Sequence, residues 1–484
     1  MLSELTGWSL LSGPIRAALT VAVVIGLGVL LLRRGRRWLL VGVPLAGCGA
    51  VALAVGSVWI VERVWKPFPD ILDRRVYFWG GVAVLAVLLA TLRAFFRCRD
   101  RRYPVTATAI ALSSVVVVIA AAGQINVLFA AYPTLGSILG IPDYRTLALD
   151  QIRGTDRTAV DRDPLSPVWE APAAMPATGA VTTGTIPPTV SRFEARPAIV
   201  YLPPAYFAEP RPLLPVLVLL AGVPGGPEDW LAGGRLVETM DSFSAQHAGL
   251  APVVVVADAT GTQFGNPACV DSHLGNVDTY LGTDVPNWVK STFQIDPDPQ
   301  GWAIGGLSYG GTCSLQLATA HPDIYPTFLD LSGQIEPGLG DHRRTVTDVF
   351  AGDEQAFRRI NPLDLLHTHR YPDSAGAFVA GSADPEAQQA LQLLAIAARD
   401  AGMDVHYSEL PRRSHLRGVV GRSGEGTPLV GSTTRDHTLN RRTSPCSRHR
   451  GPPHRPSGTG VLLALAIRRD RPGGGQVHVR QVRR

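Results

Sequence analysis

The stretch WAIGGLSYGGTCSLQLA, residues 302–318, decides the fold class of this 484-residue chain. Its first residues are apolar and predict a strand, whereas the residues after Gly310 have helical spacing. Between them lies Gly306-Leu307-Ser308-Tyr309-Gly310, a G-x-S-x-G sequence, in which glycines leave room where Cβ atoms would collide. This arrangement is typical of a strained turn that exposes a nucleophilic serine at the carboxyl end of a strand. An ordinary glycine-rich turn with an inert serine is the alternative.

The sequence on both sides of this turn alternates between strands and helices. Continuous apolar runs at 214–222 and 252–260 are typical of strands buried on both faces of a parallel sheet. Further strands are expected at 327–333, 377–384 and 404–410, with helices at 228–249, 285–292, 311–322 and 385–401. The alternation predicts a single α/β domain at 178–410, with a three-layer architecture and a mostly parallel sheet.

The N-terminal third, residues 1–141, is predicted to be a transmembrane helical region. Four long apolar segments lie at about 15–32, 38–61, 76–96 and 104–131. Their central parts contain no Asp, Glu, Lys or Arg, and each is close to the ~20 residues that cross a bilayer core. A cleaved signal peptide would explain only the first segment.

Positive charge in the loops predicts the orientation of these segments. RRGRR at 33–37 holds four Arg and residues 93–102 hold five, against five Lys or Arg in the N-terminus and the 62–75 loop together. Because cytoplasmic loops carry the excess of Lys and Arg, the first and third loops are expected inside the cell. We therefore expect a multi-pass cell-membrane protein whose α/β domain is extracytoplasmic.

Residues 142–177 are rich in Pro, Ala, Thr and Asp without a period, and they predict a linker to the folded domain. The five cysteines form no CxxC pair, so zinc and thioredoxin-like sites are not indicated. Cys269 and Cys313 both fall in the domain that the topology places in an oxidising compartment. We predict that they form a disulfide bond beside Ser308.

An oxyanion site needs two backbone N–H groups directed at the developing charge. Tyr309, the residue after the serine, would supply one of them. The other is expected in the loop LLAGVPGGPEDW, where Val223 is the candidate donor and Gly222 and Gly225 allow close approach. An ordinary glycine-rich loop between a strand and a helix is the alternative.

The acid of a triad should follow the serine at the end of a later strand, and the histidine should follow the acid. FVAGSADPEAQ places Asp384 at such a strand end, with Glu386 as the second choice. The alternative role of Asp384 is that of N-cap for a helix that begins at Pro385.

The segments GGLSYGGTCSLQLATAHPDIYPTFLDLSGQIEP and GNPACVDSHLGNVDTYLGTDVPNWV resemble the esterase family of α/β-hydrolases. This family includes the esterase D type and the secreted mycolyltransferases of the antigen 85 type. The resemblance covers about Gly179–Leu410, and the architecture is similar to that of membrane-anchored actinobacterial members. It implies acyl-ester chemistry through a serine, with no metal and no organic cofactor. Family members commonly continue after the last strand as L-P-G-G-H-T or L-P-G-G-H-S, and that histidine completes the triad.

The chain departs from this pattern after Leu410, where it reads LPRRSHLRGVVGRSGEGTPLV. Residues 411–484 contain 16 Arg, no Lys and 3 acidic residues, a net charge of +13 that leaves −8 for residues 1–410. Suppose that CGG CGG TCA encodes residues 412–414 and that one extra base follows the Pro411 codon. The neighbouring reading frame then encodes G-G-H. That frame also permits G-G-H-T-F-G-V-W-S-G-G-L-E-K-A-L-P-W-L, which has the histidine and a terminal helix.

We therefore interpret residues 411–484 as an aberrant, frameshifted tail; a genuine variant tail and a disordered basic arm are the alternatives. The tail has no aromatic residue and no period, so nucleic-acid binding is not indicated. His415 lies one residue from the expected position and is the available candidate for the base, with an exposed loop histidine as the alternative.

Together these features predict a membrane-anchored serine esterase that acts on an ester or acyl-lipid substrate. Transfer of the acyl group to a hydroxyl, as in mycolyltransferases, is one alternative. A non-catalytic cell-surface protein that has lost its histidine is the other. The expected non-substrate partner is the lipid bilayer.

Overall fold

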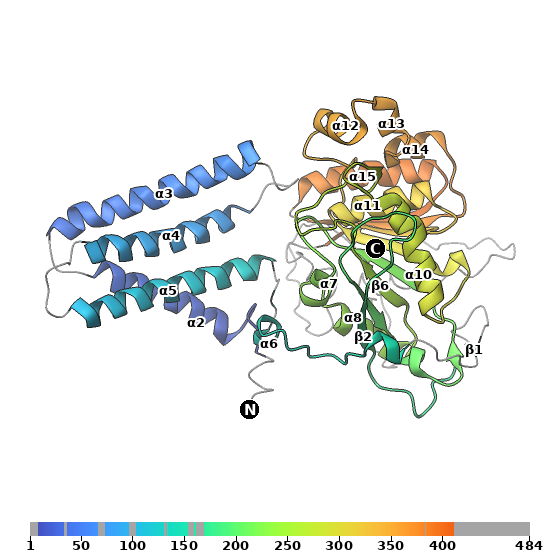
Figure 1. Ribbon diagram of the computed structural model, residues 1–484, viewed down its shortest axis with the longest axis horizontal. Coiled ribbons are helices and arrows are strands. Elements are labelled where there is room, and N and C mark those ends of the chain that lie inside the picture. The colour runs from blue at the N-terminus through green and yellow to red at the C-terminus, as the bar shows by residue number, and fades with distance from the viewer. Residues whose placement is uncertain are drawn as a thin grey trace, which may run out of the picture.

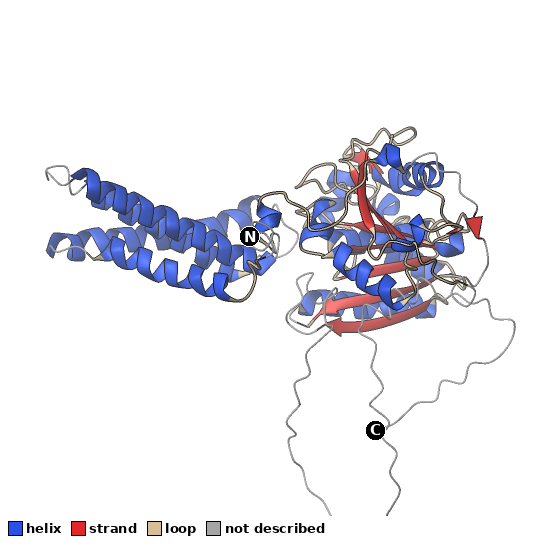
Figure 2. Ribbon diagram, turned by 90° about the horizontal axis from the view of Figure 1, so that it is seen from below, coloured by secondary structure: helices blue, strands red, loops and turns tan. Residues whose placement is uncertain are grey.

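The computed structural model describes residues 8–32, 36–65, 73–95, 103–129, 132, 134–152, 159–160, 169–382 and 384–410. A bundle of long helices lies beside an α/β domain (Figures 1 and 2). His415 and the remainder of the Arg-rich tail lie outside the described residues.

Four long apolar helical segments form the bundle. They are α2 (Pro14–Leu31), the continuous run η1 (Trp38–Gly42), α3 (Val43–Trp59) and η2 (Ile60–Trp65), then α4 (Arg74–Phe95) and α5 (Tyr103–Phe129). By length and composition each could cross a membrane. Large apolar side chains face outward along them, for example Val24, Leu40 and Val55, each more than 60% exposed. At the end of α4, Arg93 is buried and donates to the carbonyls of Leu30 and Leu32, where α2 ends.

The α/β domain is built on one eight-stranded sheet. Its strands are β2 (Ala180–Gly184), β3 (Ala198–Leu202), β5 (Val216–Leu220), β6 (Val253–Ala257), β9 (Trp302–Leu307), β10 (Thr327–Leu331), β11 (Ala375–Gly381) and β12 (Asp404–Leu410). They lie in the order β12-β11-β10-β9-β5-β6-β3-β2. Only the pairs β2–β3 and β3–β6 are antiparallel. The predicted mostly parallel sheet is therefore confirmed, and the apolar runs at β5 and β6 are buried along their whole length.

Helices cover both faces of this sheet, as a three-layer fold requires. One face carries α7 (Glu228–Ala232) and α8 (Leu236–Gln246), whose Val237, Met240 and Phe243 pack on the sheet. The other face carries α10 (Val285–Thr292), α11 (Tyr309–Ala320), α14 (Pro362–Thr368) and α15 (Pro385–Asp400). Two further helices, α12 (His342–Phe350) and α13 (Glu354–Arg358), precede α14 between β10 and β11 (Figure 1).

The remaining elements are short. They are α6 (Leu135–Ile138), η3 (Leu149–Gln151), β1 (Ala159–Val160), η4 (Pro204–Phe207), β4 (Arg211–Pro212), β7 (Asp271–Ser272), β8 (Gly275–Asn276), α9 (Val277–Thr279), η5 (Tyr280–Asp284) and η6 (Pro299–Gly301).

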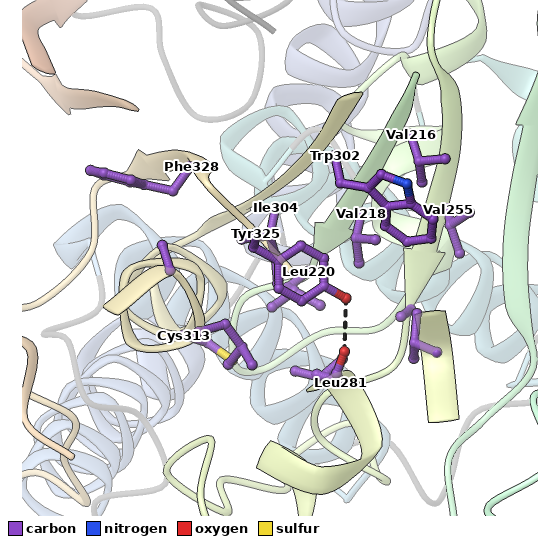
Figure 3. Packing of buried hydrophobic residues seen from close by; sticks show 14 of the residues in the cluster. Val216, Val218, Leu220, Val255, Leu281, Trp302, Ile304, Cys313, Tyr325 and Phe328 are labelled. Atoms are coloured by element: carbon purple, nitrogen blue, oxygen red, sulfur yellow. Dashed lines mark hydrogen bonds between the residues drawn. The ribbon is translucent and has the colours of Figure 1, made fainter. Parts of the chain in front are cut away.

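The main core lies between the central strands and the helices of the α11 face. Val218 of β5 and Ile304 of β9 are fully buried there beside Tyr325, as Figure 3 shows. The hydroxyl of Tyr325 donates to the Leu281 carbonyl at 2.7 Å, so this buried polar group is satisfied. The strand that leads to Ser308 is packed against this core and pairs with β5 and β10 on its two sides.

The segment 142–177, expected as a linker, packs on the α/β domain in its described parts. Leu147 N–H donates to Val181 O, and Val181 N–H donates to Arg145 O. The segment therefore pairs in parallel with the edge strand β2. Ile152 is buried in the main core, and the Trp169 indole donates to Ala248 O. Its apolar residues do not recur at a regular spacing, because isolated side chains such as Ile152 are buried one at a time.

The predicted disulfide bond is confirmed: Cys269 and Cys313 are bonded, with their Cα atoms 5.5 Å apart. Cys313 lies in α11, five residues after Ser308, and Cys269 lies in the loop between β6 and α9. The bond joins this loop to the helix that follows the serine.

Candidate active site

Ser308 lies on a strained turn between β9 and α11. Its backbone has φ 53° and ψ −116°, values that a non-glycine residue adopts only when its surroundings impose them. Its N–H donates to Leu331 O at 2.8 Å, and its own carbonyl accepts from Thr312 N–H at 3.0 Å. The residue is half-buried. The strand-to-helix context predicted from the sequence is therefore present.

The two glycines of the motif are required by close backbone contacts. A Cβ atom on Gly306 would lie 2.3 Å from the Gly310 carbonyl carbon, and one on Gly310 would lie 2.5 Å from Leu220 O. Real Cβ atoms do not approach backbone atoms so closely, because the overlap is strongly repulsive. The turn can therefore be this tight only with glycine at both positions.

The loop that carries Val223 lies against this turn. A Cβ atom on Gly222 would lie 3.2 Å from Leu307 O and 3.6 Å from Ser308 Cβ. Val223 itself is buried, and Tyr309 is the first residue of α11. The structure thus brings together Ser308, Tyr309 and the Gly222–Val223 segment. The first-turn amides of α11 also lie at its positive end, where negative charge is favoured.

Asp384 lies at the same edge of the sheet as Ser308. The strand ends are in register, with Leu307 beside Leu331 and Leu331 beside Val379. Asp384 follows the end of β11 and is exposed, and its Oδ1 accepts the Ala387 N–H at 3.1 Å. This contact is that of an N-cap on α15, and Glu386 is exposed in the first turn of the same helix.

The base would enter the site from the segment after β12. Gly381 pairs with Leu410, and Ser382 N–H donates to Leu410 O, so the chain leaves β12 beside the segment that carries Asp384. His415 follows there but lies outside the described residues. Three other histidines bind elsewhere: His247 contacts Phe243 O, His321 contacts Asp278, and His342 contacts Glu336 and Glu354.

One buried carboxyl group next to the turn was not singled out from the sequence. Asp330 of β10 is fully buried, and its Oδ1 accepts the Gly333 N–H at 2.8 Å. A Cβ atom on Gly311 would lie 2.4 Å from the same oxygen, so this carboxyl group packs under the first turn of α11. Burial raises the pKa of Asp330 to about 7. Its position inside a strand sequence gave no functional signal.

A strained serine at the carboxyl edge of a mostly parallel sheet, with helices on both faces, defines the class: the domain is an α/β-hydrolase. The family model described as "Putative esterase" matches residues 194–413. An uncharacterized protein of Corynebacterium glutamicum is 39% identical over 398 residues, 81% of this chain and 88% of the relative. The MPT51 antigen of Mycobacterium leprae is 27% identical over 127 residues, 26% of this chain and 38% of the relative.

Solved structures with similar folds include a ferulic acid esterase and an S-formylglutathione hydrolase from Agrobacterium tumefaciens. The first has a TM-score of 0.41 and 18% identity, covering 49% of this chain and 92% of that chain. The second has a TM-score of 0.39 and 19% identity, covering 48% and 86%. The chain belongs to the esterase family of α/β-hydrolases.

Proposed function

We propose that this protein is a membrane-anchored serine esterase that works through an acyl-enzyme on Ser308. The observation that supports this most directly is the strained backbone of Ser308 at the turn between β9 and α11. Strain of this kind persists where the fold enforces it, and a nucleophile needs the exposed position that it gives.

The reaction has two stages. Ser308 Oγ attacks the acyl carbonyl while a histidine takes its proton, and the N–H groups of Tyr309 and Val223 hold the oxyanion. The alcohol leaves with that proton, and water then attacks the acyl-enzyme to release the acid and free serine. Asp384 would orient the histidine, which enters from the segment after Leu410. His415 is the candidate in the chain as written.

The same acyl-enzyme can pass its acyl group to a sugar or lipid hydroxyl in place of water. The resemblance of the motif segments to secreted mycolyltransferases favours this acyltransferase alternative. Product analysis with an acyl donor and an added polyol separates the two reactions. Hydrolysis converts the acyl group to free acid, whereas transfer forms an ester of the polyol. Finding only free acid would exclude transfer to that acceptor.

A fluorophosphonate probe tests the proposal, since it modifies serines that act as nucleophiles. The test uses the protein in detergent with its reading frame restored at Pro411, because the chain as written is interpreted to lack the histidine. We expect this protein to be labelled on the peptide that contains Ser308, and Ser308→Ala to abolish the label. Ser332→Ala is a matched control, because Ser332 also follows a strand of the same edge with a positive φ of 50°. Folded protein that takes no label would support the non-catalytic alternative.

A further inference from the structure

The two proposed oxyanion donors lie on different elements, Val223 on the loop after β5 and Tyr309 at the start of α11, yet both elements are bound to the residues after β6. The Tyr309 hydroxyl donates to Ala259 O at 2.9 Å and accepts the Cys269 N–H at 3.1 Å. On its other side, the same short segment holds Arg196 through Asp258 and Thr260. The spacing between the two donors therefore depends on this segment and on what binds it.

Arg196 connects this segment to the Val223 loop. Its Nε donates to Asp258 Oδ2 at 3.0 Å, and its Nη2 donates to Asp258 Oδ1 at 2.8 Å and to Thr260 Oγ1 at 2.7 Å. The same Nη2 donates to the Gly225 carbonyl at 3.0 Å. A planar guanidinium can donate two hydrogen bonds to a carboxylate and another to a carbonyl. It thereby fixes the position of the carbonyl relative to the carboxylate.

The Asp258 carboxylate is almost completely buried, with its side chain 1% exposed. Burial alone would raise the pKa of Asp258, but the hydrogen bonds from Arg196 hold it below its usual value. The carboxylate is thus ionised and needs the guanidinium beside it. The Arg196 backbone N–H also donates to Asp258 Oδ2, so the start of β3 is tied to the end of β6.

The Gly225 carbonyl lies two residues after Val223 in the loop that packs against Ser308. Within this loop the Gly225 N–H donates to Gln263 O, and the Gly226 N–H donates to Asp229 Oδ2, each at 2.9 Å. A Cβ atom on Gly226 would lie 2.6 Å from Arg196 Nη1, so the guanidinium packs directly on the loop. Arg196 is the described side chain that links this loop to Asp258.

We propose that Arg196 is a positioning residue for the oxyanion site: it ties the Gly225 carbonyl to Asp258 and so sets where the Val223 N–H lies relative to Ser308. This inference rests on the proposed esterase function for its kinetic consequence. Its structural consequence is independent of that function. The side-chain hydrogen bonds of Arg196 go to Asp258, Thr260 and the Gly225 carbonyl, so its effect on the reaction would come through the loop.

The first test measures amide hydrogen exchange in the full-length protein and in Arg196→Lys. A lysine ammonium lacks the planar fork that binds Asp258 and Gly225 together. We expect the Gly225 and Gly226 amides to exchange about tenfold faster, the effect of losing about one hydrogen bond. The β5 amides should be unchanged and serve as the folding control. Unchanged exchange in the loop would overturn the proposal, and Arg196→Gln provides a second variant if the lysine variant does not fold.

The second test is kinetic and uses the version of the chain that the fluorophosphonate labels at Ser308. We expect Arg196→Lys to lower kcat about tenfold or more with little change in KM, because a displaced donor weakens only the transition state. Arg344→Lys is the matched control, since Arg344 pairs with Asp348 on the surface of α12. Unchanged kcat in an active protein contradicts the inference. Absence of label in the protein with its reading frame restored at Pro411 contradicts the proposed function and leaves the exchange result decisive.

Discussion

Asp384 is an N-cap of α15 in the structure and the proposed acid of the triad, and one substitution separates the two roles. Asparagine caps helices about as well as aspartate, so Asp384→Asn should change the free energy of unfolding by less than ~0.5 kcal/mol. If Asp384 is the triad acid, Asp384→Asn should also lower kcat by about 10⁴ in the protein with its reading frame restored at Pro411. Thermal unfolding and ester hydrolysis measure the two effects on the same preparation.

Glu386→Gln is the control for this prediction, because Glu386 lies two residues away in the first turn of the same helix. It should leave kcat unchanged. If Glu386→Gln is inactive and Asp384→Asn is not, Glu386 is the acid. If both variants keep full activity, the N-cap is the whole role of Asp384.

His321 should make the stability of the hydrolase domain depend on pH. Its Nε2 lies 3.0 Å from both oxygens of Asp278, and this hydrogen bond raises the pKa of His321 above its usual value. Because the folded pKa is the higher one, the stabilisation is complete below the unfolded pKa of about 6.5 and is lost as pH rises through the folded pKa.

Denaturant unfolding of the full-length protein and of Asp278→Asn at several pH values tests this. The variant should be less stable than the unmodified chain at pH 6, and the difference should shrink at alkaline pH. Asp323→Asn is the control, since Asp323 acts on His321 only through its charge and should have a smaller effect. A difference that stays constant with pH would refute the assignment to His321.

At the scale of elements, the disulfide bond holds the loop before α9 against α11. Breaking it with Cys269→Ala and Cys313→Ala should lower the free energy of unfolding by about 3–4 kcal/mol, because a loop with a sequence separation of 44 gains entropy in the unfolded chain. Cys48→Ala should have no such effect, since Cys48 is free and exposed. Alkylation of both thiols in unreduced protein would contradict the bond.

The strands and the serine turn could be predicted from the sequence because their signals are local. Apolar runs such as 216–220 and 253–257 are buried throughout, so residue type alone identifies them as central strands. The G-x-S-x-G turn is also a local signal, since its five residues are consecutive and Gly306 meets Gly310 within the motif. Apolar length was similarly sufficient for the four N-terminal helices.

The contacts that complete the candidate site could not be predicted, because they join residues far apart in the chain. Arg196 and Asp258 are separated by 62 positions, and nothing near either residue indicates the other. The packing of Tyr144, Leu147 and Ile152 on the domain was missed for the same reason, because isolated apolar residues have no period. Asp384 follows the predicted strand, but its geometry alone does not separate a cap from an acid.

At the scale of the whole molecule, the loop charges predict that the hydrolase domain lies outside the cell. Protease added to intact cells should therefore remove epitopes within 179–410. An epitope placed in the 33–37 loop should survive, because that loop is predicted to be cytoplasmic. Protection of the hydrolase epitopes until the membrane is opened would reverse the orientation.

The C-terminal tail is the other prediction at this scale. The family match ends at residue 413, at the position where family members carry G-G-H. Deleting one base at the Pro411 codon should restore that histidine and a terminal helix, raise p-nitrophenyl ester hydrolysis by about 10⁴, and raise the unfolding temperature. Sequencing the coding DNA at Pro411 checks the reading frame directly.

Ser308→Ala in both versions gives the background rate for this comparison. If the chain as written already matches the repaired chain, and His415→Ala abolishes that activity, then His415 is the base and the frameshift interpretation is wrong.

The pairing of Arg145 and Leu147 with Val181 has a consequence for where the enzyme can work. Tyr132 still binds Asn126 of α5 through two hydrogen bonds, so the tether is confined to the stretch between Tyr132 and Tyr144, and α6 shortens it further. Such a tether extends to about 35 Å at most. A hydrolase anchored in this way would reach only esters close to its own helical bundle. Esters fixed in more distant layers of the envelope would stay out of its reach, and only mobile esters could diffuse to it.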